Sequence, residues 1–341
     1  MTTEPIISFE KVLDALLSDR RDFPNKYLQQ FSDIPTLELK TVLDIWPRVS
    51  LSRKLALLKE LNTLAKSDTL VSFDDFARAV LIDPDPQVRT LAIRLLDECE
   101  DVRLVPAYLE MLLSDPDTEV RVEVANALKM FVDLGELDEI AESVFHQVED
   151  ALLSAAAGED NVRVRRTALE SLGYSSRVEV STLIESSFHR EDPQWQASAL
   201  TAMGRSADDR WNETVLQSLV DEDERIRKAA VEAAGELALK VAGPILLKML
   251  SEEEDDDIIN AAIWSLSQIG GEDVRTFLES LLDNLAEDDE QVAFLEEALD
   301  NLAFTEDLDR FDLLAIDPDD DLLELAATDD VDTDVEEEDE E

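Results

Sequence analysis

Residues 83–96 read DPDPQVRTLAIRLL, and a stretch of the same form returns five times farther along the chain. Each copy has a polar, acidic turn, then an apolar anchor, with small or apolar residues four and eight positions after the anchor. The anchors are Val88, Val120, Val164, Trp195, Ile226 and Ile258, separated by 32, 44, 31, 31 and 32 residues. Such a period is typical of stacked two-helix units, none of which buries its own apolar face. We therefore expect an all-α fold, an α-solenoid of antiparallel helix pairs.

The repeat pattern divides the chain into three expected parts. Residues 76–304 hold six or seven repeats, the last of them degenerate and polar, as the end of an array requires. Residues 1–75 do not follow the repeat and contain amphipathic segments at 9–17, 37–46 and 52–65, so they predict an N-terminal helical cap. Residues 305–341 predict an acidic, disordered tail, because residues 317–341 carry 15 acidic side chains and no basic one.

Two further expectations concern local structure. The step of 44 residues adds about ten residues at 132–147, which predicts either a longer first helix or an inserted loop. Glycines fall near the ends of the second helices, where a left-handed residue often closes a helix. These glycines are Gly173, Gly204, Gly235, Gly270 and Gly271.

The turn acids, the following Val-Arg pair and the small residue at the helix crossing make residues 76–302 resemble HEAT repeats, in the short form found in bilin lyases. The pairs Asp85 and Arg89, Asp117 and Arg121, and Asp223 and Arg227 match this pattern in full. Arg165 matches it loosely, after Asp160-Asn161. Repeat four departs with Trp195-Gln196, and repeat six departs with Ile258-Ile259. The resemblance implies a fold and says little of function, because such arrays serve as scaffolds, adaptors and, rarely, enzymes.

The Asp and Arg of these turns predict a structural ladder. The carboxylate caps the second helix, and the guanidinium reaches a carboxylate of the adjacent unit. The alternative is a basic stripe for an acidic ligand, formed by Arg89, Arg121, Arg165 and Arg227. Interleaved carboxylates would largely cancel that stripe.

Charge excludes some partners. The net charge is −52. A negative charge of this size repels phosphate backbones and anionic lipid surfaces. We therefore expect no nucleic acid and no membrane as partner, and favour a protein or peptide with basic or apolar contacts. No basic segment followed by an apolar run opens the chain, and Cys99 is the single cysteine, so we expect a cytoplasmic protein.

Residue types that commonly act in catalysis or bind metals are scarce in this chain. His146 and His189 have no second histidine or carboxylate at ligand spacing, and no phosphate-binding loop is present. Deoxyhypusine hydroxylase, an iron enzyme of similar repeats, needs His-Glu pairs that do not occur here. Cys99 has no nearby basic partners other than Arg94 and Arg103 and is expected to pack in the interior rather than to act as a nucleophile. We expect no catalytic residue, metal or cofactor.

Three groups of residues are candidates for partner binding. Trp264 ends an otherwise polar row six positions after the anchors (Arg94, Asn126, Glu170, Thr201, Glu232), so it is either an exposed contact or packing for the last unit. Arg205, Arg210 and Trp211 lie in the stretch 204–211, either a recognition edge or packing. Arg163, Arg165 and Arg166, with Arg177, form the densest basic cluster.

The acidic tail allows three interpretations. It is a solubilising segment, a docking motif through FDLLAI at 311–316, or an autoinhibitory segment that folds onto the basic cluster until a basic partner displaces it. Cutting the chain at about residue 315 separates these, since only the last predicts tighter partner binding or a changed salt dependence.

For function, we expect a non-catalytic scaffold that holds a protein or peptide in the solenoid groove. The alternative, from the resemblance only, is a bilin-lyase-like enzyme or lyase subunit that acts with a partner chain. A nucleic-acid binder of the HEAT glycosylase type comes third, since the charge opposes it.

Overall fold

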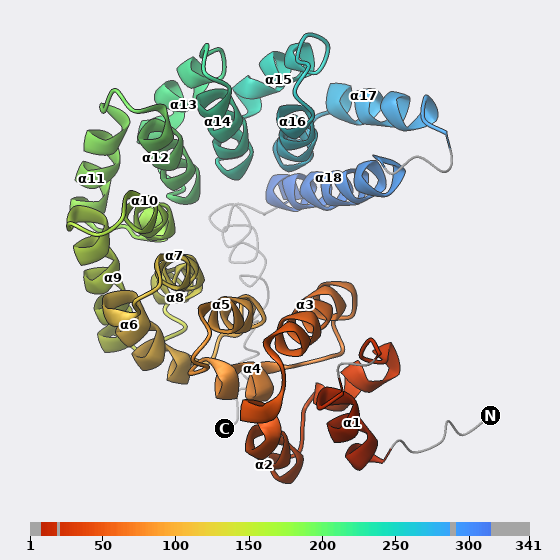
Figure 1. Ribbon diagram of the computed structural model, residues 1–341. Helices are drawn as coiled ribbons and strands as arrows, with labels where there is room; N and C mark the ends of the chain where they lie inside the picture. Colours follow the sequence, from red (N-terminus) through yellow and green to blue (C-terminus); the bar gives the residue numbers. More distant parts are fainter. Residues whose placement is uncertain (1–7, 19–20, 287–290, 315–341) are drawn as a thin grey trace, which may run out of the picture. The chain divides into compact units, whose positions relative to one another are not determined.

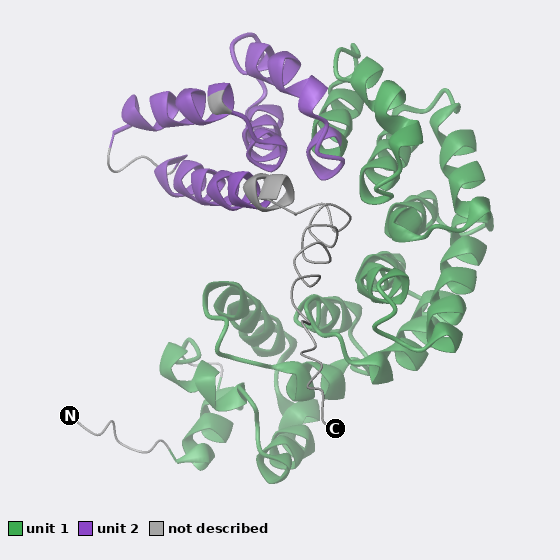
Figure 2. Ribbon diagram, turned by 180° about the vertical axis from the view of Figure 1, so that it is seen from behind, with its two compact units in different colours: residues 1–233 green, residues 234–341 purple. Residues whose placement is uncertain are grey.

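The structure is a computed structural model that describes residues 8–18, 21–286 and 291–314. The described residues form α-helices and short 3-10 helices and contain no strand. The chain divides into two compact units, Met1–Ala233 and Ala234–Glu341, coloured separately in Figure 2. The all-α solenoid fold expected from the repeat is therefore confirmed.

Unit 1 begins with helices that precede the repeats. These are α1 (Phe9–Leu16), the 3-10 helix η1 (Asn25–Phe31), α2 (Thr36–Ile45), η2 (Trp46–Arg48) and α3 (Leu51–Ser67). Pairs of helices follow in order along the chain (Figure 1). They are α4 (Asp74–Val80), α5 (Pro86–Arg94), η3 (Val102–Leu104), α6 (Val105–Ser114), α7 (Thr118–Ala127), α8 (Lys129–Glu136), α9 (Glu142–Ala157), α10 (Val162–Ser171), η4 (Leu172–Tyr174), α11 (Val178–Phe188), α12 (Pro193–Arg205), η5 (Asp209–Trp211), α13 (Asn212–Ser218) and α14 (Glu224–Glu236), the last of which runs into unit 2.

Unit 2 continues the pattern of paired helices. Its helices are η6 (Lys240–Ala242), α15 (Gly243–Met249), α16 (Asp256–Ile269), α17 (Glu272–Asp283) and α18 (Gln291–Leu314). Helix α16 packs against α15 and α18, and α17 packs against α18. Helix α18 extends past residue 304, so residues 305–314 are helical and do not belong to a disordered tail. The acidic stretch 317–341 and the expectations placed on it lie outside the described residues.

The helices of unit 1 form two layers. The second helix of each pair packs on the next second helix, α3 on α5, α5 on α7, α7 on α10 and α10 on α12. The first helices α6, α9 and α11 form the other layer (Figure 1). The five anchors in unit 1 are at most 5% exposed, and the residues four positions after each are equally buried. Burial of these apolar positions drives the stacking within unit 1, as the hydrophobic period predicts. The sixth anchor, Ile258, is buried within unit 2.

Each second helix begins at a polar cap. The carboxylates of Asp85, Asp117, Asp192 and Asp255 accept backbone N–H bonds from residues two or three positions later, and Asn161 does the same through its amide oxygen. These bonds satisfy N–H groups that have no partner within the helix.

The residues near 132–147 are divided between two helices. Residues 132–136 belong to α8, which lies between α7 and α9, and residues 142–147 begin α9. Helix α9 has 16 residues, against 10 in α6 and 11 in α11, so the longer first helix is present and a further helix precedes it. A Cβ at Gly135 would fall within the ring of Phe145, so α8 packs on α9 as closely as a glycine allows.

The glycines do not act as predicted, with one exception. Gly270 and Gly271 have positive φ angles and close α16, but Gly204 lies within α12 and Gly235 within α14. The left-handed residues that follow these helices are Ala207 and Ala238. Gly173 and Gly235 instead permit close helix crossings, because a Cβ there would meet the backbone of the next second helix.

Candidate functional site

Ion pairs join successive turns in unit 1. The Arg89 guanidinium donates to both carboxylate oxygens of Asp115, and Arg121 binds Asp160 in the same bidentate way. Lys54 of α3 binds Asp83 at 2.7 Å. A lysine of α3 therefore occupies the place that arginines occupy later, and α3 behaves as the second helix of an earlier pair.

The turns before α5 and α7 each use two acids for two tasks. Asp85 and Asp117 cap their helices, whereas Asp83 and Asp115, two positions earlier, receive the cation from the preceding unit. Burial alone would raise the pKa of Asp83, but hydrogen bonds from Lys54, the N–H of Asp85 and Trp46 outweigh burial and lower it. The sequence pattern did not single out the earlier acid, although it is visible as the first Asp of D-P-D.

The ladder changes at repeat four. Arg165 donates to the carbonyl of Ala156 at 3.2 Å and lies 5.4 Å from the Trp195 ring, with no carboxylate within ion-pair distance in the described chain. Arg190 stacks on the same ring at 4.0 Å. Arg227 donates to the carbonyls of its own turn at Asp221 and Glu222, and Arg225, its neighbour in α14, binds the capping Asp223.

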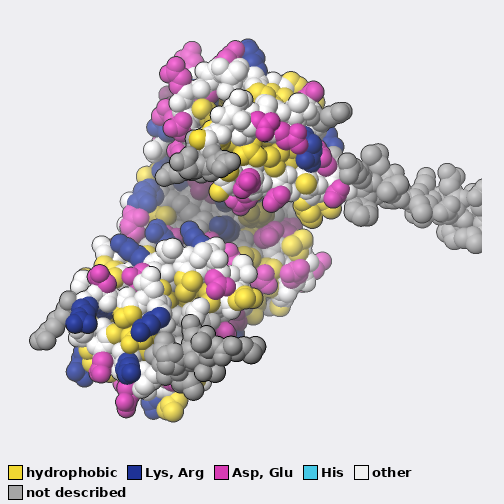
Figure 3. Space-filling view, turned by 90° about the vertical axis from the view of Figure 1, so that its right-hand side faces the viewer, with side chains coloured by type: hydrophobic (Ala, Val, Ile, Leu, Met, Phe, Trp, Pro, Cys, Tyr) yellow, Lys and Arg dark blue, Asp and Glu magenta, His cyan; other side chains and the backbone are white. Residues whose placement is uncertain are grey.

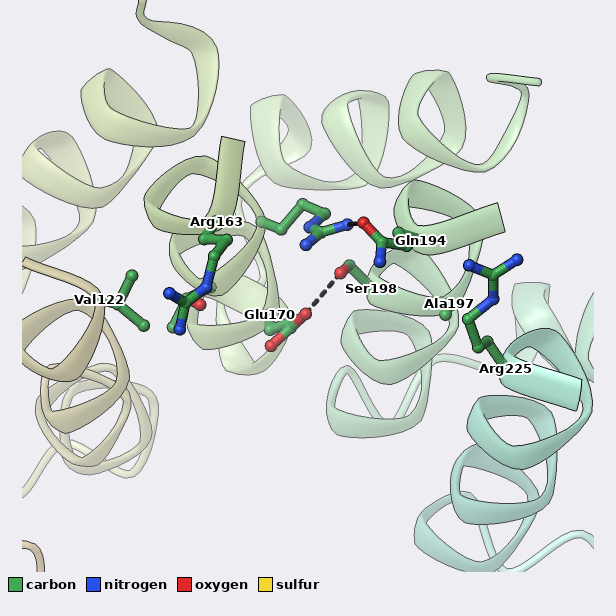
Figure 4. A pocket seen from close by; sticks show the side chains of 9 residues that line it. Val122, Arg163, Glu170, Gln194, Ala197, Ser198 and Arg225 are labelled. Carbon is green, nitrogen blue, oxygen red and sulfur yellow. Dashed lines mark hydrogen bonds between the residues drawn. The ribbon is translucent and has the colours of Figure 1, made fainter. Parts of the chain in front are cut away.

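A pocket of about 270 Å³ opens on the second helices of unit 1 (Figure 4). Its walls come from four of them in turn, α7, α10, α12 and α14. The lining residues are Val122, Arg163, Arg166, Thr167, Glu170, Gln194, Ala197, Ser198 and Arg225. Arg163, Gln194 and Arg225 each precede a repeat anchor and are spaced by 31 residues, so they occupy equivalent positions in successive units. We call this surface the second-helix pocket.

The cations of this pocket differ in their partners. Arg163 pairs with Glu119 of α7, and Arg225 pairs with Asp223. Arg166 donates to the amide oxygen of Gln194 and has no carboxylate partner in the described residues. Its remaining N–H groups are open to an acceptor from outside the chain.

Glu170 of α10 lines the second-helix pocket beside Ser198 of α12 (Figure 4). Burial raises the pKa of Glu170, while a hydrogen bond from Ser198 and the charges of Arg205 and Arg166 oppose that rise in part. The Glu170 carboxyl therefore takes up a proton more readily than an exposed glutamate does. When it is neutral, it no longer offsets the positive charge of Arg163 and Arg166 in the same pocket.

The stretch 204–211 does not form one exposed edge. Trp211 is 7% exposed and is packed among its neighbours, although it also lines a second pocket of unit 1. Arg205 donates to the carbonyl of Glu170 at 2.8 Å and lies over Tyr174. Of the three candidate residues, Arg210 alone is exposed, and it pairs with Asp208.

The other candidates are scattered. Trp264 of α16 is half-buried in unit 2, and Arg177 binds Asp150 at 2.7 Å away from the second-helix pocket. The basic cluster predicted from sequence therefore divides, with only Arg163 and Arg166 reaching one pocket. Acidic, basic and apolar side chains are interspersed on the face drawn in Figure 3.

The cysteine and the two histidines are held in local contacts. Burial raises the pKa of the Cys99 thiol, which disfavours the nucleophilic thiolate. His146 stacks on Phe145, and Nδ1 of His189 lies 2.8 Å from the carbonyl oxygen of Glu185. Across the described residues, no three His, Cys, Asp or Glu side chains gather as metal ligands. None of the described helices has the length and apolar character of a bilayer span.

A model of HEAT repeats matches residues 75–172 and 180–267, more than half of the chain. The chain belongs to the HEAT-repeat family. The match begins one residue before the first predicted repeat and ends in α16, within the predicted array. No curated protein matches the chain significantly.

Solved structures of similar form are distant in sequence. The Escherichia coli protein YibA is 16% identical, with a TM-score of 0.40, covering 84% of this chain and 99% of its own. The complex of CpcE and CpcF of phycocyanin lyase from Nostoc sp. PCC7120 is 17% identical, with a TM-score of 0.49 and coverages of 88% and 96%. Human deoxyhypusine hydroxylase is 15% identical, with a TM-score of 0.33 and coverages of 76% and 95%. Likeness of this degree carries no information on activity or partner.

Proposed function

We propose that this HEAT-repeat protein is a non-catalytic scaffold that binds a polypeptide along the second-helix face of unit 1. The supporting observation is the second-helix pocket, whose lining comes from four successive second helices. A surface that repeats at the interval of the units suits an extended chain. At about 270 Å³ the pocket is also slightly smaller than the roughly 300–1,000 Å³ of typical small-molecule sites.

The contact at the pocket and the net charge of the chain predict different properties of the same partner. Arg166 offers N–H groups to a carbonyl or carboxylate oxygen of the bound segment, since its contact within the chain is the neutral amide of Gln194. The net charge of −52 favours a partner whose overall charge is positive and accelerates its encounter. We therefore propose a basic protein that places polar backbone or an acidic side chain over Arg166.

Site-specific photo-crosslinking in the native host tests this proposal. A photoreactive residue replaces Ala197, which lines the pocket on α12, or Glu110, which is exposed on the first helix α6. We expect a polypeptide adduct from position 197 and none from position 110. Equal adducts from both positions, or none from 197, would contradict the proposal. A purified protein that alters the absorbance of a linear tetrapyrrole on mixing would favour the bilin-lyase-like alternative instead.

A further inference from the structure

One step of the ion-pair ladder lacks its cation. The residue that corresponds to Arg89 and Arg121 in repeat four is Gln196, and the acid that corresponds to Asp115 in the next turn is Asp221. Asp221 accepts the N–H of Asp223 at 2.8 Å, as Asp115 accepts that of Asp117 at 2.9 Å. Asp115 then receives an arginine, whereas Asp221 has no Lys, Arg or His within ion-pair distance in the part of the chain that the structure describes.

A pocket of about 400 Å³ lies beside this carboxylate. It is formed by α11, α12, α13 and the turn after α13, all within unit 1. The lining residues are Glu185, Phe188, His189, Met203, Trp211, Thr214, Gln217, Ser218 and Asp221. None of them lines the second-helix pocket, so the two sites are separate. We call this cavity the Asp221 pocket.

The walls of the Asp221 pocket combine charge with polarizable surface. Asp221 and Glu185 supply two carboxylates, and Glu185 has no described ion pair. Trp211 and Phe188 supply aromatic rings, and Met203 supplies a flexible thioether. This is the set of groups that an arginine side chain satisfies, because its planar guanidinium binds carboxylates through a fork of N–H donors, stacks on aromatic rings and has an apolar stem.

The arginines near the pocket make other contacts. Arg227 donates to the backbone carbonyls of Asp221 and Glu222, both at 3.0 Å. Arg190 lies on the Trp195 ring, and Arg210 pairs with Asp208 at 2.5 Å and lies 5.8 Å from the Trp211 ring. Neither guanidinium lines the pocket. His189, which does, has Nδ1 close to a carbonyl oxygen of its own helix. The charge of the lining side chains is therefore complementary to a cation.

We propose that the Asp221 pocket binds an arginine side chain of a partner polypeptide, which supplies from outside the cation that the chain's own ladder provides to Asp115 and Asp160. This inference goes beyond the proposed function, because it concerns a second site and names the side chain that the site accepts. It does not depend on binding at the second-helix face.

A pair of small probes tests the site in the full-length protein. Nα-acetyl-L-arginine N-methylamide carries the guanidinium, and the corresponding citrulline derivative has nearly the same shape without the charge. Titrations followed by ligand-observed NMR give the affinity of each. We expect the arginine probe to bind about tenfold more tightly than the citrulline probe, since a charge-assisted hydrogen bond to a half-buried carboxylate is worth about that factor.

Two variants locate the binding. Asp221→Asn should remove the preference for the arginine probe, whereas Glu222→Gln, an equal change of charge on the neighbouring exposed residue, should retain it. Circular dichroism checks that both variants fold. Equal binding of the two probes to the wild type, or an unchanged preference in Asp221→Asn, would overturn the proposal.

A third variant adds the missing arginine of the ion-pair ladder to the chain itself. Gln196→Arg places on α12 the residue that binds the turn acid in other units. We expect it to raise Tm by about 2–4 °C and to weaken the arginine probe at least severalfold, because the new guanidinium competes for Asp221. Unchanged Tm and unchanged probe affinity would show that Asp221 is not an open step of the ladder.

Discussion

The guanidinium of Arg89 holds Asp115 by two parallel hydrogen bonds, Nε to Oδ2 at 2.8 Å and Nη2 to Oδ1 at 2.7 Å. The two side chains are only 11% and 7% exposed, and Arg89 also donates to the carbonyl of Asp83 in its own turn. One arginine thus joins two successive turns, which keeps the spacing between adjacent repeats constant.

Removing this guanidinium should destabilise unit 1 strongly. We expect Arg89→Gln to cost about 3–5 kcal/mol, because it leaves the buried Asp115 without its counter-charge. Arg94→Gln is the matched control in the same helix, since Arg94 is 53% exposed and binds Glu123 at the surface. Its cost should be no more than about 1 kcal/mol. Urea unfolding of both variants measures the difference, and equal losses would contradict a structural role for the buried pair.

The Asp83 contact predicts a pH dependence. Because its hydrogen bonds lower the pKa of Asp83 in the folded protein, its stabilisation is present above the ordinary aspartate pKa and is lost as pH falls through the lowered value. The urea midpoint of the wild type should therefore exceed that of Asp83→Asn at pH 7, and the gap should narrow below about pH 4. A gap that stays constant down to pH 2 would mean that Asp83 acts through packing alone.

Glu170 predicts the opposite trend. Burial raises the pKa of Glu170, so its contribution is most favourable at acid pH and is lost as pH rises through the raised value. Glu170→Gln keeps the shape of the side chain and removes the titration. We expect the variant to gain stability relative to the wild type between pH 4 and pH 8, measured by urea unfolding at each pH. A relative loss over that range would contradict the burial argument.

Gly235 and Gly243 of unit 2 should respond differently to an added methyl group. A Cβ at Gly235 would lie 2.7 Å from Cα of Ser265 in α16, whereas nothing lies within 4 Å of a Cβ at Gly243. Gly235→Ala should therefore cost about 1–3 kcal/mol. Gly243→Ala should be neutral or stabilising by up to about 1 kcal/mol. Thermal unfolding of both variants decides, and a tolerated Gly235→Ala would show that the crossing can widen.

Much of the fold follows from local pattern. The anchors at Val88 and its equivalents repeat with the residues that must be buried beside them, and burial at each position agrees. The caps follow equally well, because an Asp before an apolar helix has few other places for its carboxylate. Helix α8 does not follow, since Gly135 lowers helix propensity and its contact with Phe145 of α9 depends on tertiary packing.

The candidate sites were less predictable. Arg163 and Arg166 were recognised as basic, but Arg225, from another repeat, joins them only once the units are stacked. Arg163 and Arg225 each directly precede a repeat anchor, so their equivalent positions can be recognised in the sequence from the 31-residue spacing of the anchors. Trp195-Gln196 was visible as a departure from the pattern. The sequence pattern does not show that this departure leaves Asp221 without an arginine, because the acid that receives each arginine lies in the next turn.

The most direct test of the scaffold is the affinity of the polypeptide that crosslinks at position 197. Isothermal titration calorimetry compares the wild type with Arg166→Glu, inside the second-helix pocket, and with Arg48→Glu, exposed on η2. We predict at least about tenfold weaker binding, or about 1.4 kcal/mol, for Arg166→Glu, and a change within about twofold for Arg48→Glu. Unchanged affinity in Arg166→Glu, or equal losses in both variants, would contradict binding along the second helices.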